Sequence, residues 1–136
     1  MKLYEIAEEL RSLLAEDFRT IRISSLQTSD QLMKEIRAIN PDKLPGVIIV
    51  FDRREFSSPD AIDSAYLTLV LVDHFRAGSD ERAVSLFRES EKLLERIPAE
   101  GTKLGDVWIC PTDVAAASVD PAYAVLAVGV SCRQGF

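Results

Sequence analysis

The stretch Ala65-Tyr66-Leu67-Thr68-Leu69-Val70-Leu71-Val72-Asp73-His74 decides the fold. Both sets of alternating positions in it are largely apolar, which is typical of a strand that is covered on both faces. The run Val47-Ile48-Ile49-Val50-Phe51 follows a Pro45-Gly46 break and is similarly apolar, with many β-branched residues. The sequence therefore predicts two central strands in one sheet.

Three segments around these strands have the apolar periodicity of amphipathic helices, with apolar residues recurring at every third or fourth position. Their ends are marked by polar residues that can cap a helix and by prolines that stop one. The predicted helices cover residues 2–16, a short segment from Ser29 or Asp30 to Ile39, and a long segment from Ser79 or Asp80 to Pro98.

The rest of the chain predicts further strands and one loop. Phe18 to Ile23 alternates with a period of two and carries two arginines, which favours a short strand near a sheet edge. The polar stretch from Arg53 to Asp63 is interpreted as a connecting loop. Two apolar runs, Val107 to Ala116 and Tyr123 to Cys132, flank a turn signal at residues 119–122 and predict an antiparallel hairpin.

This order of elements predicts a single α+β domain over residues 1–136. We expect a mixed, mostly antiparallel sheet of about five strands, with the N-terminal helix, the short second helix and the long helix packed on one face. Strands and helices do not alternate regularly, which argues against a doubly wound parallel sheet.

Composition excludes several classes of function. The chain has 136 residues and a net charge of −6, and both halves are acidic on balance, so no basic surface for nucleic acid is predicted. No apolar run in the chain, including the stretch Leu67 to Val72, approaches the ~20 residues of a membrane span. The first residues lack the apolar core of a signal peptide, so we expect a cytosolic protein.

Residues that could carry catalysis are few, and we expect no enzyme, no cofactor and no metal site. His74 is the single histidine, and its neighbour Asp73 would point to the opposite face of a strand. Cys110 and Cys132 lie on the two arms of the hairpin and are expected to be reduced thiols. A three-residue loop would place them opposite each other, whereas a two-residue loop would send them to opposite faces.

The hairpin is also unusually poor in charge, so few residues guard it against pairing with another chain. Two interpretations stay open: the hairpin lies inside the sheet of one chain, or a neighbouring subunit covers it. Arg53 and Arg54, which follow a buried strand, could hold an anion or a partner's carboxylate. The candidate subunit interface comprises Val107, Ile109, Leu126, Val128, Val130, Arg53 and Arg54.

A family resemblance covers nearly the whole chain. It rests on the opening amphipathic helix and on four further segments: Leu44 to Val50, Tyr66 to Val72, Leu86 to Leu94 and Tyr123 to Arg133. In this layout the chain resembles small tail proteins of long-tailed bacteriophages and prophages, specifically Mu-like minor tail proteins and tail terminators. The resemblance rests on layout, and no functional residue is carried over from it.

The resemblance implies a non-enzymatic structural protein of the virion tail, assembled in the cytoplasm of the bacterial host. Tail terminators form rings, typically hexamers, that cap the tail tube and join it to the head connector. The implied partners are other copies of the chain, the tail-tube protein and the connector protein. The alternatives are a head–tail connector (neck) protein and, from another class, a small ligand-binding or regulatory domain with its pocket between the long helix and the sheet.

Overall fold

The structure is a computed structural model that describes residues 3–24, 28–56, 63–74, 80–117 and 123–134. The elements in chain order are α1 (Leu3–Leu14), β1 (Thr20–Ser24), α2 (Ser29–Arg37), the 3₁₀ turn η1 (Pro41–Lys43), β2 (Gly46–Phe56), β3 (Asp63–His74), α3 (Asp80–Arg96), β4 (Thr102–Leu104), β5 (Val107–Ala117) and β6 (Tyr123–Gln134).

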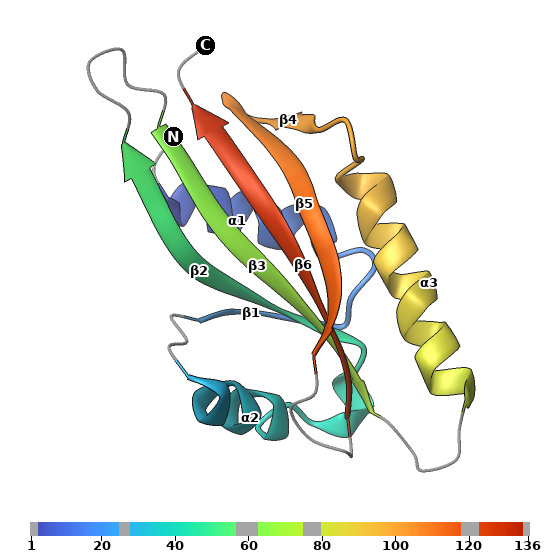
Figure 1. Ribbon diagram of the computed structural model, residues 1–136. Coiled ribbons are helices and arrows are strands. Elements are labelled where there is room, and N and C mark those ends of the chain that lie inside the picture. Colours follow the sequence, from blue (N-terminus) through green and yellow to red (C-terminus); the bar gives the residue numbers. More distant parts are fainter. Residues whose placement is uncertain (1–2, 25–27, 57–62, 75–79, 118–122, 135–136) are drawn as a thin grey trace.

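The strands form one six-stranded sheet in the order β1-β2-β3-β6-β5-β4 (Figure 1). β1 pairs with β2 in parallel, and the other neighbours are antiparallel. β3 lies near the middle of the sheet, as the apolar residues on both of its faces predict. The fold is therefore α+β with a mixed, mostly antiparallel sheet, and it has one strand more than the five expected.

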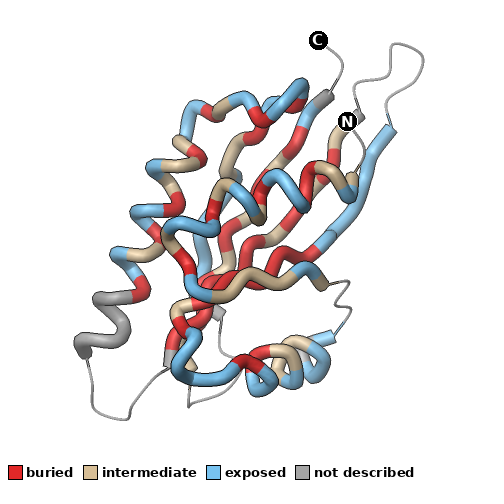
Figure 2. Tube along the Cα trace, turned by 180° about the vertical axis from the view of Figure 1, so that it is seen from behind, coloured by how far each residue is buried: buried red, intermediate tan, exposed pale blue. Residues whose placement is uncertain are grey.

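The two faces of the sheet carry separate apolar cores. α1 and α3 cover one face, which we call the helical face (Figure 2). There, Leu10 and Leu93 belong to the same buried cluster as Leu69 of β3. The opposite face, which we call the open face, has a smaller cluster in which Ile36, just before the end of α2, packs with Ile48. α2 covers only one end of this face, because it runs alongside the edge strand β1, whose Arg22 forms an ion pair with Glu35 of α2 (Figure 1).

Three predictions about the elements were wrong. α2 lies on the open face, opposite to α1 and α3, because the alternate residues of β2 and β3 there are apolar as well. The helix begins after Thr28, whose side chain accepts a hydrogen bond from the Gln31 N–H and so acts as the N-cap in place of Ser29 or Asp30. Arg53 does not begin a loop, because β2 continues to Phe56.

The predicted strand at Phe18 to Ile23 is confirmed as β1, at the edge of the sheet. The hairpin of β5 and β6 is also confirmed. Its turn at residues 119–122 and the proposed cap Ser79 lie outside the described residues. β4 was not predicted, because three residues are too few to show a period. Among the described residues, no helix is long and apolar enough to cross a membrane.

Candidate functional site

Two β-bulges mark the open face. On β2 the register with β3 shifts between Phe51 and Arg53, so that Asp52 is the extra residue. On β5 the register with β6 shifts in the same way between Pro111 and Asp113. A bulge bends its strand and re-aims side chains, and bulges are over-represented beside functional sites. β3 and β6 run between the two bulged strands, so the bulges lie on either side of the same stretch of sheet.

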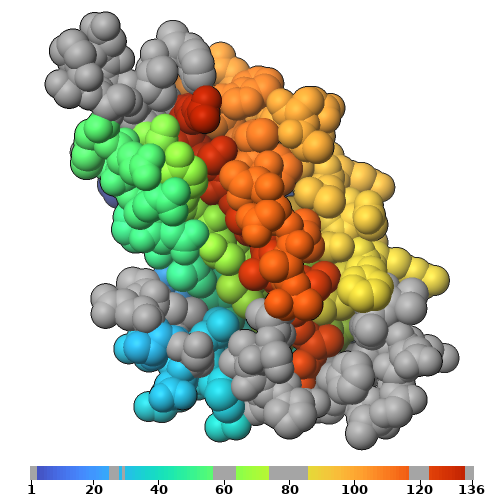
Figure 3. Space-filling view, viewed as in Figure 1, coloured from blue at the N-terminus to red at the C-terminus, as the bar shows by residue number. Residues whose placement is uncertain are grey.

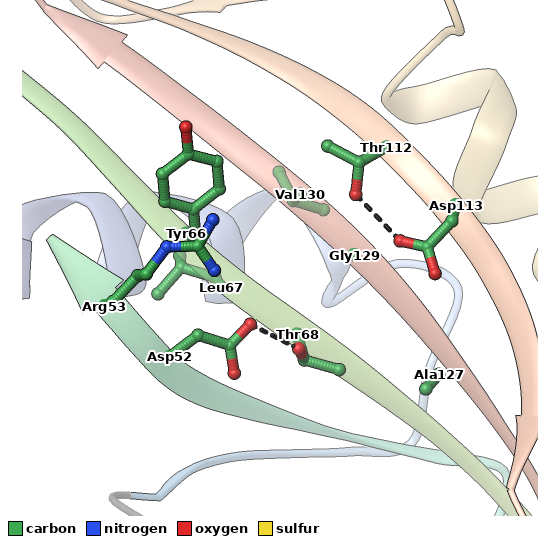
Figure 4. Close-up of a pocket in the computed structure, with 10 residues that line it drawn as sticks. All are labelled: Asp52, Arg53, Tyr66, Leu67, Thr68, Thr112, Asp113, Ala127, Gly129 and Val130. Atoms are coloured by element: carbon green, nitrogen blue, oxygen red, sulfur yellow. Dashed lines mark hydrogen bonds between the residues drawn. The ribbon is translucent and has the colours of Figure 1, made fainter. Parts of the chain in front are cut away.

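A pocket of about 390 Å³ lies between the bulges. Side chains from β2, β3, β6 and β5 line it, and these strands are uncovered in the space-filling view of this face (Figure 3). The pocket is bordered by Asp52, Arg53, Tyr66, Leu67, Thr68, Thr112, Asp113, Ala127, Gly129 and Val130 (Figure 4).

Hydrogen bonds within the lining fix its polar groups. The Thr68 hydroxyl donates to Asp52 Oδ2 at 2.7 Å, and the Thr112 hydroxyl donates to Asp113 Oδ1 at 2.8 Å (Figure 4). A Cβ added at Gly129 would collide with both the Thr112 hydroxyl and the Asp113 carboxylate. Because Gly129 has no Cβ, there is room beside it for the hydrogen-bonded side chains of Thr112 and Asp113.

Arg53 forms the wall of the pocket on the β2 side. Its guanidinium lies 4.0 Å from the centre of the Tyr66 ring, and its Nε donates to Glu55 Oε1 at 3.0 Å. The hydrogen bond to Glu55 raises the pKa of this guanidinium, so Arg53 stays charged. The residues that line the pocket thus include one cation, two carboxylates, two threonine hydroxyls and the phenol of Tyr66, a set that suits hydrogen bonding to polar groups of a partner. Among the described residues, no cluster of three or more His, Cys, Asp or Glu residues could hold a metal ion.

The residues of the candidate interface do not come together in one exposed surface. Five of them are buried in the core of a single chain, on the helical face: Val107, Ile109, Leu126, Val128 and Val130. Because these side chains are buried within one chain, they are not available to a neighbouring subunit. Their burial favours the interpretation that the hairpin lies inside the sheet of one chain. Arg53 and Arg54 are both exposed, but they point to opposite faces of β2, since Arg53 pairs with Tyr66 and Arg54 with Ala65.

The exposed surfaces of the sheet lie elsewhere, along two halves of strands. β1 pairs only with Gly46 to Val50 of β2, and every residue from Phe51 to Phe56 is exposed. β4 pairs only with Val107 to Ile109 of β5, and residues 112–116 are exposed. We call residues 51–56 the β2 edge and residues 112–117 the β5 edge. Sequence reasoning missed both, because an exposed strand half that pairs on one side only shows no clear alternation of apolar and polar residues.

The bulge on β5 decides the positions of the cysteines. Cys110 pairs with Ser131, and Cys132 pairs with Ile109, so the two thiols lie on opposite faces. Cys132 is buried on the helical face, whereas Cys110 is half-buried and its thiol contacts the Ala99 carbonyl oxygen at 3.3 Å. Asp73 is buried as well, and the side chain of His74 lies outside the described residues.

The thiols are expected to react at very different rates. Burial raises the pKa of the Cys132 thiol from 9.0 to about 12, so almost none of it is thiolate at pH 8. In native protein, a chromogenic disulfide reagent should modify Cys110 promptly and Cys132 only after denaturant is added. The Cys110→Ser variant should lose the prompt reaction. Prompt modification of Cys132 in that variant would contradict its burial.

Comparison with protein-family models gives no match for this chain, and comparison with curated proteins gives none either.

Proposed function

We propose that this chain is a structural protein that assembles with copies of itself into a ring, as a tail terminator that caps the tail tube of a long-tailed bacteriophage. The observation that carries the proposal of self-assembly is the pair of exposed strand halves, the β2 edge and the β5 edge. They lie on opposite sides of the same sheet, so each copy offers two different surfaces. Two different surfaces make a head-to-tail contact, which is the kind of contact that generates rings.

Exposed apolar side chains support the same proposal. Phe56 is 74% exposed and Phe51 40% exposed on the β2 edge, and Val114 is 44% exposed on the β5 edge. Exposed apolar side chains on open strand edges favour a partner that covers them. The net charge of −6 helps to keep free subunits soluble before assembly.

The assignment to phage tails depends on the resemblance in layout. It supplies the proposed partners, which are the tail-tube protein on one face of the ring and the head connector on the other. It also supplies the proposed hexameric state and the proposed location, in the host cytoplasm during assembly and then in the virion tail. A neck protein would form a ring as well, but it would bind the connector and not the ends of tail tubes.

Light scattering during gel filtration tests the proposal. A ring-sized species should appear as the protein concentration rises or when tail tubes are added, and electron microscopy should place the protein at tube ends. Phe56→Lys should shift the equilibrium toward monomer without changing the circular dichroism spectrum, because a charge on the edge opposes pairing. Tyr4→Lys is the matched control, since Tyr4 is 64% exposed on α1. A chain that stays monomeric and ignores tube ends would contradict the proposal.

The pocket on the open face favours a second candidate, a small ligand-binding domain. Its polar lining could hold a small polar molecule. This pocket lies on the face opposite to α3, not between the long helix and the sheet as the sequence led us to expect. A saturable ligand that raises the melting temperature of the monomer, and loses this effect in Thr68→Val, would favour this second function.

A further inference from the structure

We propose that the β2 edge of one copy pairs with the β5 edge of the next copy, so that the sheets of neighbouring subunits join into one continuous sheet. This inference rests on the proposed function only in requiring that the chain assembles with itself. It names the surfaces that meet, their relative direction and the residues that face each other.

Strand direction permits this pairing without turning either copy over. β2, β3, β6 and β5 are neighbours in this order, and each pair of neighbours is antiparallel. β2 and β5 therefore run in opposite directions across the sheet (Figure 1). When two copies stand side by side in the same orientation, the β2 edge of one meets the β5 edge of the other in antiparallel fashion, the geometry that pairs strands well.

The short outer strands β1 and β4 each leave one half of the neighbouring strand unpaired. β1 covers the first half of β2, and β4 covers the first half of β5, so the free halves lie at opposite ends of the sheet (Figure 1). A neighbour that is displaced along the strands can bring its free β5 half against the free β2 half. In this position β4 of one copy lies beyond the end of β2, and β1 of the other lies beyond the end of β5. α3 packs mainly on β3 and β6.

The faces of the side chains restrict the register. Arg54 of β2 and both Val114 and Ala116 of β5 lie on the helical face, because their partners on β3 and β6 do so. One register that keeps the faces matched places Phe56 opposite Val114 and Arg54 opposite Ala116. It brings two exposed apolar side chains together and sets large residues of β2 against small residues of β5.

The register displaced by two residues keeps the faces matched as well, with Arg54 opposite Val114. It places Glu55 opposite Asp113, and two like charges in directly opposed positions repel each other. The register with Phe56 opposite Val114 avoids this repulsion, since it places Glu55 opposite Ala115. We therefore favour it.

This register also fits a closed ring. Residues 53–56 lie beside the start of β3, and residues 114–117 lie, across β6, beside Val70 and Leu71. In this register each copy is displaced from the previous one by about six residues, or about 20 Å, along the strand direction. Between one β2 and the next lie four strands, which together span about 19 Å across the sheet. If all copies lie at the same height around the ring axis, their strands tilt by about 45° from that axis. This angle is at the upper end of the strand tilts seen in closed barrels.

Engineered disulfides test the pairing. In a Cys110→Ser background, we would prepare Phe56→Cys, Val114→Cys and the double variant. Opposed residues of antiparallel strands lie about 4.5–5.5 Å apart at Cα, which is within the range of a disulfide. On mild oxidation the double variant should give a ladder of covalent oligomers, and a mixture of the two single variants should give dimers only. Reductant should return both to single chains.

A matched control uses Phe56→Cys mixed with Ile23→Cys. Ile23 is 41% exposed on β1, on the same side of the sheet as β2, so the proposed contact never brings these two positions together. This mixture should stay uncrosslinked. Arg54→Cys mixed with Val114→Cys tests the register displaced by two residues in one direction, and Phe56→Cys mixed with Ala116→Cys tests the register displaced by two residues in the other direction.

The two possible failures can be distinguished by light scattering on the same samples. Oligomers that form no cross-link in any of these registers would overturn the edge pairing and leave the proposed ring intact. Samples with neither oligomers nor cross-links, and with no affinity for tail-tube ends, would overturn both proposals. A cross-link between Phe56→Cys and Val114→Cys in most of the assembled protein would establish the pairing.

Discussion

Val128→Lys should abolish the folded state. Val128 is fully buried, lies opposite Leu69 of β3 and packs in the core under α1 and α3. The variant would place an ammonium group there without an opposing charge and would remove apolar contacts. We expect a loss of more than about 4 kcal/mol in the free energy of unfolding, a large share of the ~5–15 kcal/mol that stabilises an ordinary domain. Circular dichroism and urea titration measure it.

The neighbouring strand provides a matched control. Val114 lies directly opposite Val128 and on the same face of the sheet, but it is 44% exposed. Val114→Lys should therefore change the free energy of unfolding by less than about 1 kcal/mol. Equal stability of the two variants would show that Val128 is not in the core, and the second interpretation of the hairpin, in which a partner covers it, would then hold.

Gly101→Ala should have the second largest effect. Gly101 has a φ of 90°, in the left-handed region that residues with a Cβ rarely adopt. It lies in the turn from α3 to β4, where its N–H donates to the Pro98 carbonyl oxygen, and an added Cβ would collide with the indole ring of Trp108. Backbone strain and overpacking together should lower the free energy of unfolding by about 2–4 kcal/mol, measured by urea denaturation.

A double-variant cycle separates the two causes. In a Trp108→Leu background the ring is gone, and only the strain of the left-handed backbone remains. The penalty of Gly101→Ala should then fall to about 1–2 kcal/mol. An unchanged penalty in this background would mean that the indole ring does not limit the space at Gly101. Far-ultraviolet circular dichroism should follow the unfolding, because the chain has a single tryptophan.

The centre of the fold could be predicted because burial on both faces leaves a continuous apolar run. β3 and the first half of β2 show this, as do the apolar stripes of the helices. The second half of β2 could not be predicted. Its residues are exposed, and it pairs with β3 on one side only, so no alternation of apolar and polar residues marks Arg53 to Phe56 as a strand.

The bulges explain the other failures. Near the turn, Val114 pairs with Val128, as the three-residue loop predicts, but the bulge shifts the pairing before it by one residue. Cys110 and Cys132 consequently lie on opposite faces, although part of the hairpin keeps the register that would oppose them. A single extra residue has no signature in composition or period, so neither bulge nor the pocket between them could be predicted.

The candidate interface could not be separated from the core by sequence, since both are apolar and poor in charge. Val130 and Ile109 have the residue types expected of either place. Burial depends on where α1 and α3 lie, and the spacing of the helices along the chain does not say which strands they cover.

The short lengths of β1 and β4 restrict the alignments in which copies of the chain could pair along their strand edges. An uncovered strand of eleven residues, the length of β2 or β5, would be a template for fibres, because successive copies could add in any alignment. In the proposed contact, the three-residue β4 and the five-residue β1 would limit how far one copy can slide along the next. Deleting either β1 or β4 should leave a longer unpaired strand edge, allow pairing in several alignments and favour insoluble aggregates.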